Sequence, residues 1–394
     1  ALTTAQIAGL SSQQVYDLST TTLKYLTTAQ IGAIETADIS VMSTAQLLVL
    51  SSIQIQALNT AQVAEITTDQ LSGLSSAAVG ALLNSNLAVL SSNKLNLLAT
   101  GSVLGFTSNQ VASLTTVQTS GLSTGVVAAL NTVAVGGLTT AQIVALTTDQ
   151  ASNLTTTTVK ALTTRQIAAL ETTDLQALNS DNIAILSSVQ LQALTTAQIA
   201  GLSSQQVYDL NSVTLQALTT RQIAALETGD VAVLGTSSMG SLLTTQLQAL
   251  TTAQIAGLSS QQVYDLSTTT LKFLTTGQIA ALETSDVAVM TTAQLLALNT
   301  TQIQALITSQ VAALTSDQVA SFTTVGLTAL TGNQIGNLSV DALGAISTAG
   351  IALMRTNQIV GLTTTQMVHL SSATLGALTT KQIAVLETSD FVAL

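Results

Sequence analysis

Residues 162–169 read Leu-Thr-Thr-Arg-Gln-Ile-Ala-Ala, and this eight-residue unit recurs along the whole chain. A large apolar residue returns at every eighth position from Leu2 to Leu394, and all 50 of these positions hold Leu, Ile, Met or Phe. A second apolar position follows five residues later, and only Thr119 and Ala151 depart from it. Because a short fixed period is typical of solenoids, we interpret residues 1–394 as a single continuous octapeptide-repeat solenoid, least regular over residues 75–137.

The hydroxyl residue after each large apolar residue predicts the start of a helix. With Thr163 as the N-cap, Gln166 lies at N3, the third helical residue, and the two form the pairing of a capping box. Leu162 and Ile167 then take the two positions of a hydrophobic staple. Because the next Leu and the next cap follow within eight residues, each helix is limited to about six residues. The predicted fold class is all-α: a solenoid or superhelix of very short capped helices, one per eight-residue repeat.

A β-solenoid is the alternative, because Thr, Val and Ile favour strands. Its weakness is the apolar spacing of five then three residues, since a strand alternates in steps of two. The residue before the large apolar position is often Ala or Gly, as at Ala33, Ala57, Gly73 and Ala169. Small residues there suit a close approach between neighbouring turns.

Longer duplications are superimposed on the octads. Two segments recur at steps of seven octads: LTTAQI at Leu138, Leu194 and Leu250, and LTT-x-QIAALET at Leu162, Leu218 and Leu274. Related segments begin 17 octads before the second series, at Leu26, and 13 octads after it, at Leu378. If a turn holds three or four whole octads, none of these steps returns a segment to the same face. We therefore expect no face-specific pattern.

The unit L-T-x-x-Q-[IV]-x-A-[LI], here residues 162–170, resembles the opening helix of a TAL-effector repeat. The chain lacks that family's Pro after the Thr, its base-reading loop and its second helix, so the resemblance implies helicity and not DNA binding. In composition the chain is also similar to large repetitive secreted and cell-surface proteins of bacteria, which are often acidic, free of cysteine and rich in Thr, Ser and Ala.

Composition and charge narrow the function classes. The formal net charge of −11 opposes binding to nucleic acid or to anionic lipid. With no Cys and one His, the chain offers neither a disulfide nor a structural zinc site. The longest largely apolar stretch, residues 125–138, is too short to span a bilayer. No glycine-rich phosphate-binding loop is present, so we expect no nucleotide, no other cofactor and no small-molecule substrate.

His369 and a set of acidic pairs are the polar residues that could carry chemistry. His369 lies just before Leu370, where a tolerated surface residue is expected rather than a catalytic base. We therefore assign no catalytic, cofactor-binding or metal-binding residue. The acidic pairs lie at the N-cap and N3 positions of their octads, where carboxylates favour the positive end of a helix by ~0.3–1 kcal/mol: Glu35/Asp38, Glu171/Asp174, Glu227/Asp230, Glu283/Asp286 and Glu387/Asp390.

Two further interpretations of these pairs are open. A cation precedes three of them by six residues (Arg165, Arg221 and Lys381), which suggests weak surface ion pairs. Weak calcium sites are the other reading, although neither an EF-hand loop nor a glycine-aspartate nonapeptide is present.

The sequence thus favours a structural protein over an enzyme. We expect an extracellular or cell-surface protein that forms or belongs to a filament, sheath, surface layer or adhesin stalk. Both ends of the sequence lie within the repeat frame without a polar capping octad, so we expect either that the chain continues beyond this segment or that its ends stack on neighbouring copies. The expected partner is a second copy of the chain, associated end to end or laterally. The alternative is a binding module for ice, carbohydrate or a partner protein that uses regular Thr and Ser rows.

Overall fold

The structure is a computed structural model that describes residues 2–389, and within these residues it contains 48 short helices and no strand. The all-α solenoid is therefore confirmed, and the β-solenoid alternative is wrong for this part of the chain. Contacts divide the chain into two units, Ala1–Leu202 (unit 1) and Ser203–Leu394 (unit 2), and each is described by itself.

The helices of unit 1 are four to six residues long and start at eight-residue intervals or close to them: α1 Thr4–Ala8, α2 Ser12–Tyr16, α3 Thr20–Lys24, α4 Thr28–Gly32, α5 Thr36–Val41, α6 Thr44–Leu48, α7 Ser52–Gln56, α8 Thr60–Ala64, α9 Thr68–Ser72, α10 Ser76–Ala81, α11 Asn84–Ala88, α12 Ser92–Leu95, α13 Thr100–Val103, α14 Ser108–Ser113, α15 Thr116–Ser120, α16 Thr124–Ala129, α17 Thr132–Gly136, α18 Thr140–Val144, α19 Thr148–Ser152, α20 Thr156–Ala161, α21 Thr164–Ala169, α22 Thr172–Ala177, α23 Ser180–Ala184, α24 Ser188–Ala193 and α25 Thr196–Ala200.

Unit 2 continues in the same way: α26 Ser204–Tyr208, α27 Ser212–Ala217, α28 Thr220–Ala225, α29 Thr228–Val233, α30 Thr236–Gly240, α31 Thr244–Ala249, α32 Thr252–Ala256, α33 Ser260–Asp265, α34 Thr268–Lys272, α35 Thr276–Ala281, α36 Thr284–Val289, α37 Thr292–Ala297, α38 Thr300–Ala305, α39 Thr308–Ala312, α40 Ser316–Ala320, α41 Thr324–Ala329, α42 Gly332–Gly336, α43 Val340–Gly344, α44 Thr348–Leu353, α45 Thr356–Val360, α46 Thr364–Val368, α47 Ser372–Gly376 and α48 Thr380–Ile383.

Most helices begin as the capping pattern predicts. In α21, Thr163 has an extended N-cap conformation, its hydroxyl oxygen accepts a hydrogen bond from Gln166 N–H at 3.3 Å, and its own N–H donates to Gln166 Oε1 at 2.7 Å. The helix ends at Ala169, the last residue of this octad, and Leu170 N–H donates to Ile167 O at 3.3 Å. The capping box is thus confirmed, and the helix has room for only 6 residues.

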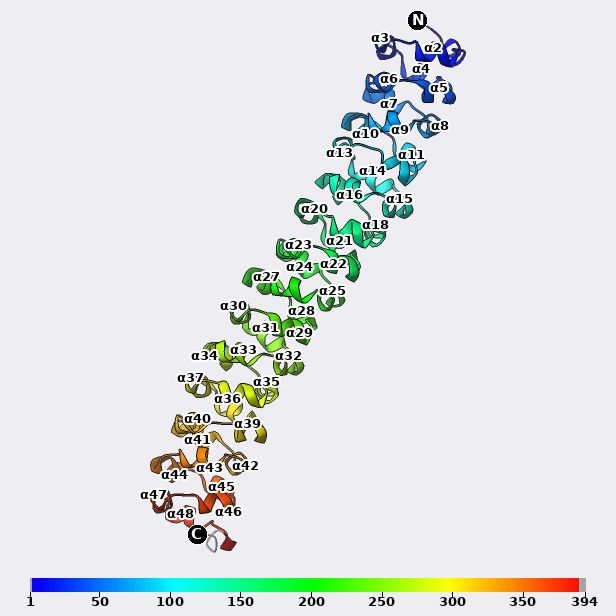
Figure 1. Ribbon diagram of the computed structural model, residues 1–394. Helices are drawn as coiled ribbons and strands as arrows, with labels where there is room; N and C mark the ends of the chain where they lie inside the picture. Colours follow the sequence, from blue (N-terminus) through cyan, green and yellow to red (C-terminus); the bar gives the residue numbers. More distant parts are fainter. Residues whose placement is uncertain (1, 390–394) are drawn as a thin grey trace. The chain divides into compact units, whose positions relative to one another are not determined.

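Within each unit, residues that contact one another in successive turns are between three and four octads apart in the sequence. Each helix packs on the helix three places along the chain, so that α10, α13 and α16 follow one another down one side of unit 1 (Figure 1). Side-chain hydrogen bonds between turns join residues 28 and 31 apart, as from Gln166 to Leu138 and Val135. One turn of the coil therefore takes close to three and a half octads.

Because one turn does not hold a whole number of octads, the expectation that segments duplicated at seven-octad steps lie on different faces is wrong. Two turns of three and a half octads make seven octads, so Leu138 and Leu194 return to nearly the same face within unit 1, and Leu218 and Leu274 do so within unit 2. The expectation fails because it assumed a whole number of octads per turn. The seven-octad duplications therefore preserve a face-specific pattern, whereas steps of 17 and 13 octads are not a whole number of such turns.

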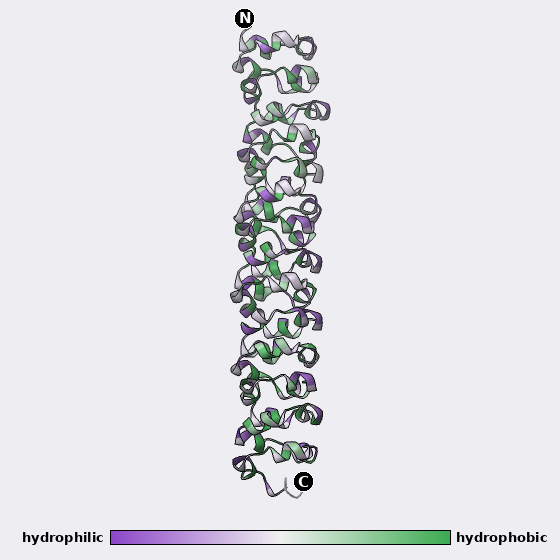
Figure 2. Cartoon of the chain, turned by 90° about the vertical axis from the view of Figure 1, so that its left-hand side faces the viewer, coloured by the Kyte–Doolittle hydropathy of each residue, from purple (hydrophilic) through white to green (hydrophobic). Residues whose placement is uncertain are grey.

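Both apolar rows point into the coil. Ile167 is 0% exposed and Leu170 is 3% exposed. The two exceptions to the second row, Thr119 and Ala151, are also buried, and the Thr119 hydroxyl donates to Thr115 O of its own octad at 3.0 Å. Figure 2 shows hydrophobic residues in every turn, beside hydrophilic residues of the same short helices.

Neighbouring turns approach most closely at the small residue before the large apolar position. At Gly105 and at Gly137, an added Cβ would overlap backbone atoms of Ser76 and Ser108, which lie in the preceding turn. The sequence-based expectation of close approach is thus confirmed at these glycines. Gly136, one residue earlier and inside α17, has no neighbouring atom within 4 Å of such a Cβ.

These two adjacent glycines provide a matched test. We expect Gly137→Ala to destabilise the protein by about 1–3 kcal/mol, because the backbone of the preceding turn must move. Gly136→Ala should stabilise it by about 0.5–1 kcal/mol, because Ala loses less entropy than Gly in a helix. Urea unfolding followed by circular dichroism measures both, and equal effects of the two substitutions would contradict the stacking described here.

Candidate functional site

The principal polar feature is a row of buried glutamines at N3, one in most octads. In α35, Gln278 is 2% exposed, its Oε1 accepts from Thr275 N–H at 2.9 Å, and its Nε2 donates to Leu247 O and Leu250 O at 2.7 and 2.9 Å. Those carbonyls lie at the end of α31 in the preceding turn. Because the ends of short helices leave backbone groups without intrahelical partners, one amide serves the start of one helix and the end of another.

The burial of these glutamines depends on the preceding turn and not on the capping box. Gln6 and Gln14 accept from Thr3 N–H and Ser11 N–H at 2.8 and 2.9 Å, as in a capping box, yet both side chains are exposed. From Gln30 onward, every glutamine at N3 in the described residues is buried. Each octad therefore forms its capping box by itself, and stacking adds the bond to the preceding turn.

Other polar residues at N3 reach the same carbonyls. Asn182 Nδ2 donates to Leu154 O at 3.0 Å, and Lys94 Nζ donates to Ile66 O at 3.0 Å, each 28 residues back. Six of the eight N3 positions in residues 75–137 lack Gln, which explains why this stretch is the least regular: Ala78, Asn86, Lys94, Ser102, Val126 and Ala134.

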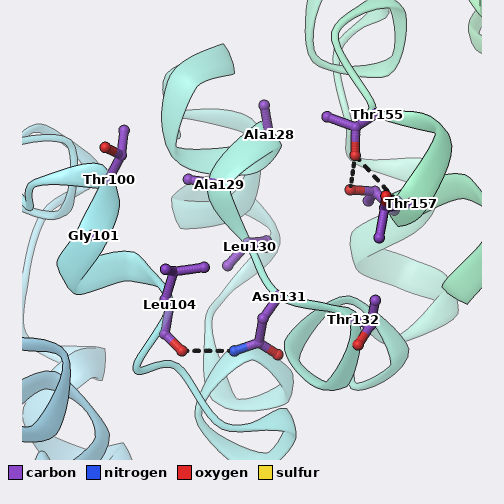
Figure 3. Close-up of a pocket in the computed structure, with 11 residues that line it drawn as sticks. Thr100, Gly101, Leu104, Ala128, Ala129, Leu130, Asn131, Thr132, Thr155 and Thr157 are labelled. Carbon is purple, nitrogen blue, oxygen red and sulfur yellow. Dashed lines mark hydrogen bonds between the residues drawn. The ribbon is translucent and has the colours of Figure 1, made fainter.

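A surface recess of about 580 Å³ is lined by residues of four octads, none of which has Gln at N3 (Figure 3). Its lining contains only Thr, Gly, Leu, Ala and Asn, with Thr100 and Gly101 on one side and Thr155 on the other. Two hydrogen bonds order the wall, from Asn131 Nδ2 to Leu104 O and between the hydroxyls of Thr155 and Thr158, both at 2.8 Å. The recess offers hydroxyl and methyl contacts and no acid, base or nucleophile pair.

His369 occupies an exposed position at the C-cap of α46, as expected of a surface residue. Its Nδ1 lies 2.8 Å from Thr365 O of the same helix. Within residues 2–389, no three His, Asp or Glu side chains gather in an arrangement that could hold a metal ion. Nor does this part of the chain contain a helix with the length and apolar character to cross a bilayer.

The acidic pairs take the N-cap and N3 positions predicted for them, except that Asp390 lies outside the described residues. Among the described residues, no ion pair joins Arg165 to Glu171 or Arg221 to Glu227. The ion pairs suggested by the sequence are therefore absent at these two places. The Asp side chains instead accept from Ser or Thr hydroxyls 26 residues back: Ser12 to Asp38 at 2.6 Å, Thr148 to Asp174 at 3.0 Å, Ser204 to Asp230 at 2.8 Å and Ser260 to Asp286 at 2.8 Å.

Sequence reasoning placed the N3 glutamines in a capping box but missed their bond to the preceding turn. A signal for it is present in the sequence. A capping box accepts Glu as readily as Gln, yet no octad has Glu at N3. Glu has the length of Gln but no N–H group, so its absence indicates that the amide N–H of Gln bonds an acceptor.

The profile of the ALTTAQ repeat matches residues 31–68, 127–156, 167–204, 223–260, 279–316 and 287–324. The six letters of that name occur unchanged at residues 1–6, 193–198 and 249–254, and the second and third copies span the end of one helix and the N-cap and N3 of the next. The protein is thus a repeat protein with regular octads. No curated protein is similar enough to the chain to count as a match.

Replacing one buried glutamine tests the inter-turn bond. We expect Gln278→Leu to lower the free energy of unfolding by about 2 kcal/mol or more, because Thr275 N–H and two carbonyls lose a partner in a dry site. Gln304→Leu, at an exposed position of α38, should change it by less than about 0.5 kcal/mol. Urea denaturation compares the two, and a cost at Gln278 no larger than at Gln304 would show that the bond contributes little.

Proposed function

We propose that this chain is a structural protein of the cell surface or extracellular space, and that it forms or belongs to a filament, sheath, surface layer or adhesin stalk rather than catalysing a reaction. The observation that carries the proposal is the recurrence of one inter-turn bond. Gln54, Gln166 and Gln278 each join the turn before them through carbonyls 28 and 31 residues back. Turns can therefore be added without a new kind of interface.

A polar bond inside an apolar coil also suits a load-bearing element. Separating two turns exposes the Leu and Ile rows and breaks the amide bonds together. Because both contributions recur in each turn, resistance to extension is spread along the chain and not concentrated at one contact. The bacterial cell surface is the setting that composition favours, since the chain is acidic, free of cysteine and rich in Thr and Ser.

Exposed aromatic side chains support self-association. All four tyrosines are more than half exposed, and three of them share the sequence SSQQVYDL: Tyr16, Tyr208 and Tyr264. In unit 2, Tyr208 and Tyr264 are seven octads apart, so they recur on nearly the same face two turns apart. Tyr is enriched at protein interfaces because it combines apolar area with a hydroxyl.

A second candidate is a repeat-based binding module for ice, carbohydrate or a partner protein. The recess lined by Thr100, Thr132 and Thr155 favours it, because its hydroxyls could bond a polar ligand. Thermal hysteresis and glycan-array binding would detect such ligands. If neither assay detects a ligand, the structural proposal remains the better supported of the two.

Polymer formation tests the structural proposal. In near-physiological salt, light scattering and electron microscopy of the purified chain should show polymers that grow with protein concentration. In the variant Y208S/Y264S, lateral association should weaken, because the repeated aromatic face is removed, whereas Y25S should leave it unchanged. A monomeric mass at every concentration would contradict the proposal.

A further inference from the structure

Four octads carry a buried aspartate at the N3 position that glutamine usually fills. Asp38, Asp174, Asp230 and Asp286 are 1–4% exposed. One carboxylate oxygen of each accepts from a hydroxyl in the preceding turn, as Asp174 Oδ1 does from Thr148 at 3.0 Å. The second oxygen, Oδ2, is buried without a hydrogen-bond partner in Asp38, Asp174 and Asp230, whereas in Asp286 it accepts from the Glu283 N–H at 3.3 Å and has no donor partner of its own. Such orphaned oxygens are costly and call for an explanation.

The neighbouring octads show what this oxygen lacks. At N3, Gln uses Oε1 as an acceptor and Nε2 as a donor to carbonyls of the preceding turn. Asn has the length of Asp, and both Asn86 and Asn182 still donate to the carbonyl 28 residues back, at 3.2 and 3.0 Å. The side chain of an Asp at N3 is therefore long enough for its second oxygen to reach that carbonyl, but without a proton this oxygen cannot donate a hydrogen bond to it.

We propose that Asp174 and Asp286, one in each unit, are proton-binding positions that lock adjacent turns together in acid. In the protonated form, the carboxyl O–H donates to the carbonyl that an Asn at N3 would reach, which belongs to Leu146 for Asp174 and to Leu258 for Asp286. The other oxygen still accepts from the Thr148 or Ser260 hydroxyl. The protonated acid thus supplies the donor to the preceding turn that the Gln amide supplies elsewhere, and the ionised form lacks this donor.

The surroundings of both groups favour the proton. Burial raises the pKa of Asp174, the hydrogen bond from Thr148 lowers it, and the nearby charge of Glu171 raises it. Burial likewise raises the pKa of Asp286, hydrogen bonds from Ser260 and the Glu283 N–H lower it, and the charge of Glu283 raises it. In both cases burial is the largest influence on the pKa, so the net shift is upward.

No cation offsets the buried charge on the helices packed against either site. For Asp174, these are α19, which carries the exposed Asp149, and α25, which has no titratable group. For Asp286, they are α33, which carries Tyr264 and Asp265, and α39, which has none. The remaining titratable groups are the N-cap residues Glu171 and Glu283, and all the carboxylates named here disfavour a further negative charge.

The sign of the pH dependence follows from linkage. A carboxyl whose pKa is higher in the folded than in the unfolded chain binds more protons when folded, so stability rises as the pH falls through the folded pKa. The gain is complete below the unfolded value of about 3.9. It is lost again as the pH rises through the folded pKa.

The test compares the full chain with the variant D174N/D286N and with D69N/D317N, which removes the same charge from two exposed aspartates on helices other than α19, α25, α33 and α39, the helices that pack against the two sites. Thermal unfolding is followed from pH 7.5 down toward pH 4 at constant ionic strength. We expect the melting temperature of the unmodified chain and of D69N/D317N to rise as the pH falls. D174N/D286N should melt higher at pH 7.5, because Asn supplies the donor at every pH, and should show a smaller rise.

A spectroscopic readout separates proton binding from a general charge effect. The infrared band of a protonated carboxyl group should appear on acidification of the folded chain at a higher pH than in D174N/D286N. Parallel pH profiles of the unmodified chain and D174N/D286N would overturn the proposal. So would stabilisation by millimolar calcium or sodium at pH 7.5 that D174N/D286N abolishes, because a metal ion and not a proton would then occupy the site.

Discussion

The fold depends on a neutral amide that is buried between turns and bonded at both ends. The backbone of an octad cannot provide hydrogen-bond partners for all of its own N–H and carbonyl groups. The N–H groups at the start of each helix and the carbonyls at its end have no intrahelical partner. Gln166 meets groups of both kinds, at Thr163 of its own octad and at Val135 and Leu138 of the turn before. Stacking is therefore obligatory for this chain, since helix ends in a dry interior must be bonded.

The same constraint explains how the chain varies. Where N3 holds Asn182 or Lys94, a shorter or a charged donor still reaches the carbonyl 28 residues back. Where it holds Asp174, the donor is gone and an oxygen is left without a partner. Apolar N3 residues such as Ala78 and Val126 supply neither an acceptor nor a donor, so the repeat also includes octads that lack this inter-turn bond.

Duplication by seven octads fits this architecture because it spans close to two turns of the coil. A segment inserted by such a step meets nearly the same neighbours as its parent, so the pairs of residues that join turns are copied together. Ser260 with Asp286 repeats Ser204 with Asp230 in unit 2, and the distance is 2.8 Å in both. The exposed tyrosines of the same segments are copied with them, which places a repeated aromatic feature on one face of that unit.

The amino-acid sequence by itself determined the helices, their caps and the two apolar rows, because the interactions that set them lie within a single octad and the residue that follows it. Gln6 and Gln14 form their capping boxes with no turn of the described chain before them, which shows that this motif is local. Thr119 and Ala151, although they break the apolar pattern, are buried in register, since the period of eight places them.

Only the tertiary structure decided how many octads make a turn. It alone also decided which group of the preceding turn forms a hydrogen bond with the second polar atom of each N3 side chain. Both depend on contacts between residues 26 to 31 apart, and a period of eight divides none of those distances evenly. The turn is set by how Leu, Ile and the small residues before them pack against the neighbouring turn. The burial of Asp174 and Asp286 follows from that packing, because each octad taken alone would leave its N3 side chain in water.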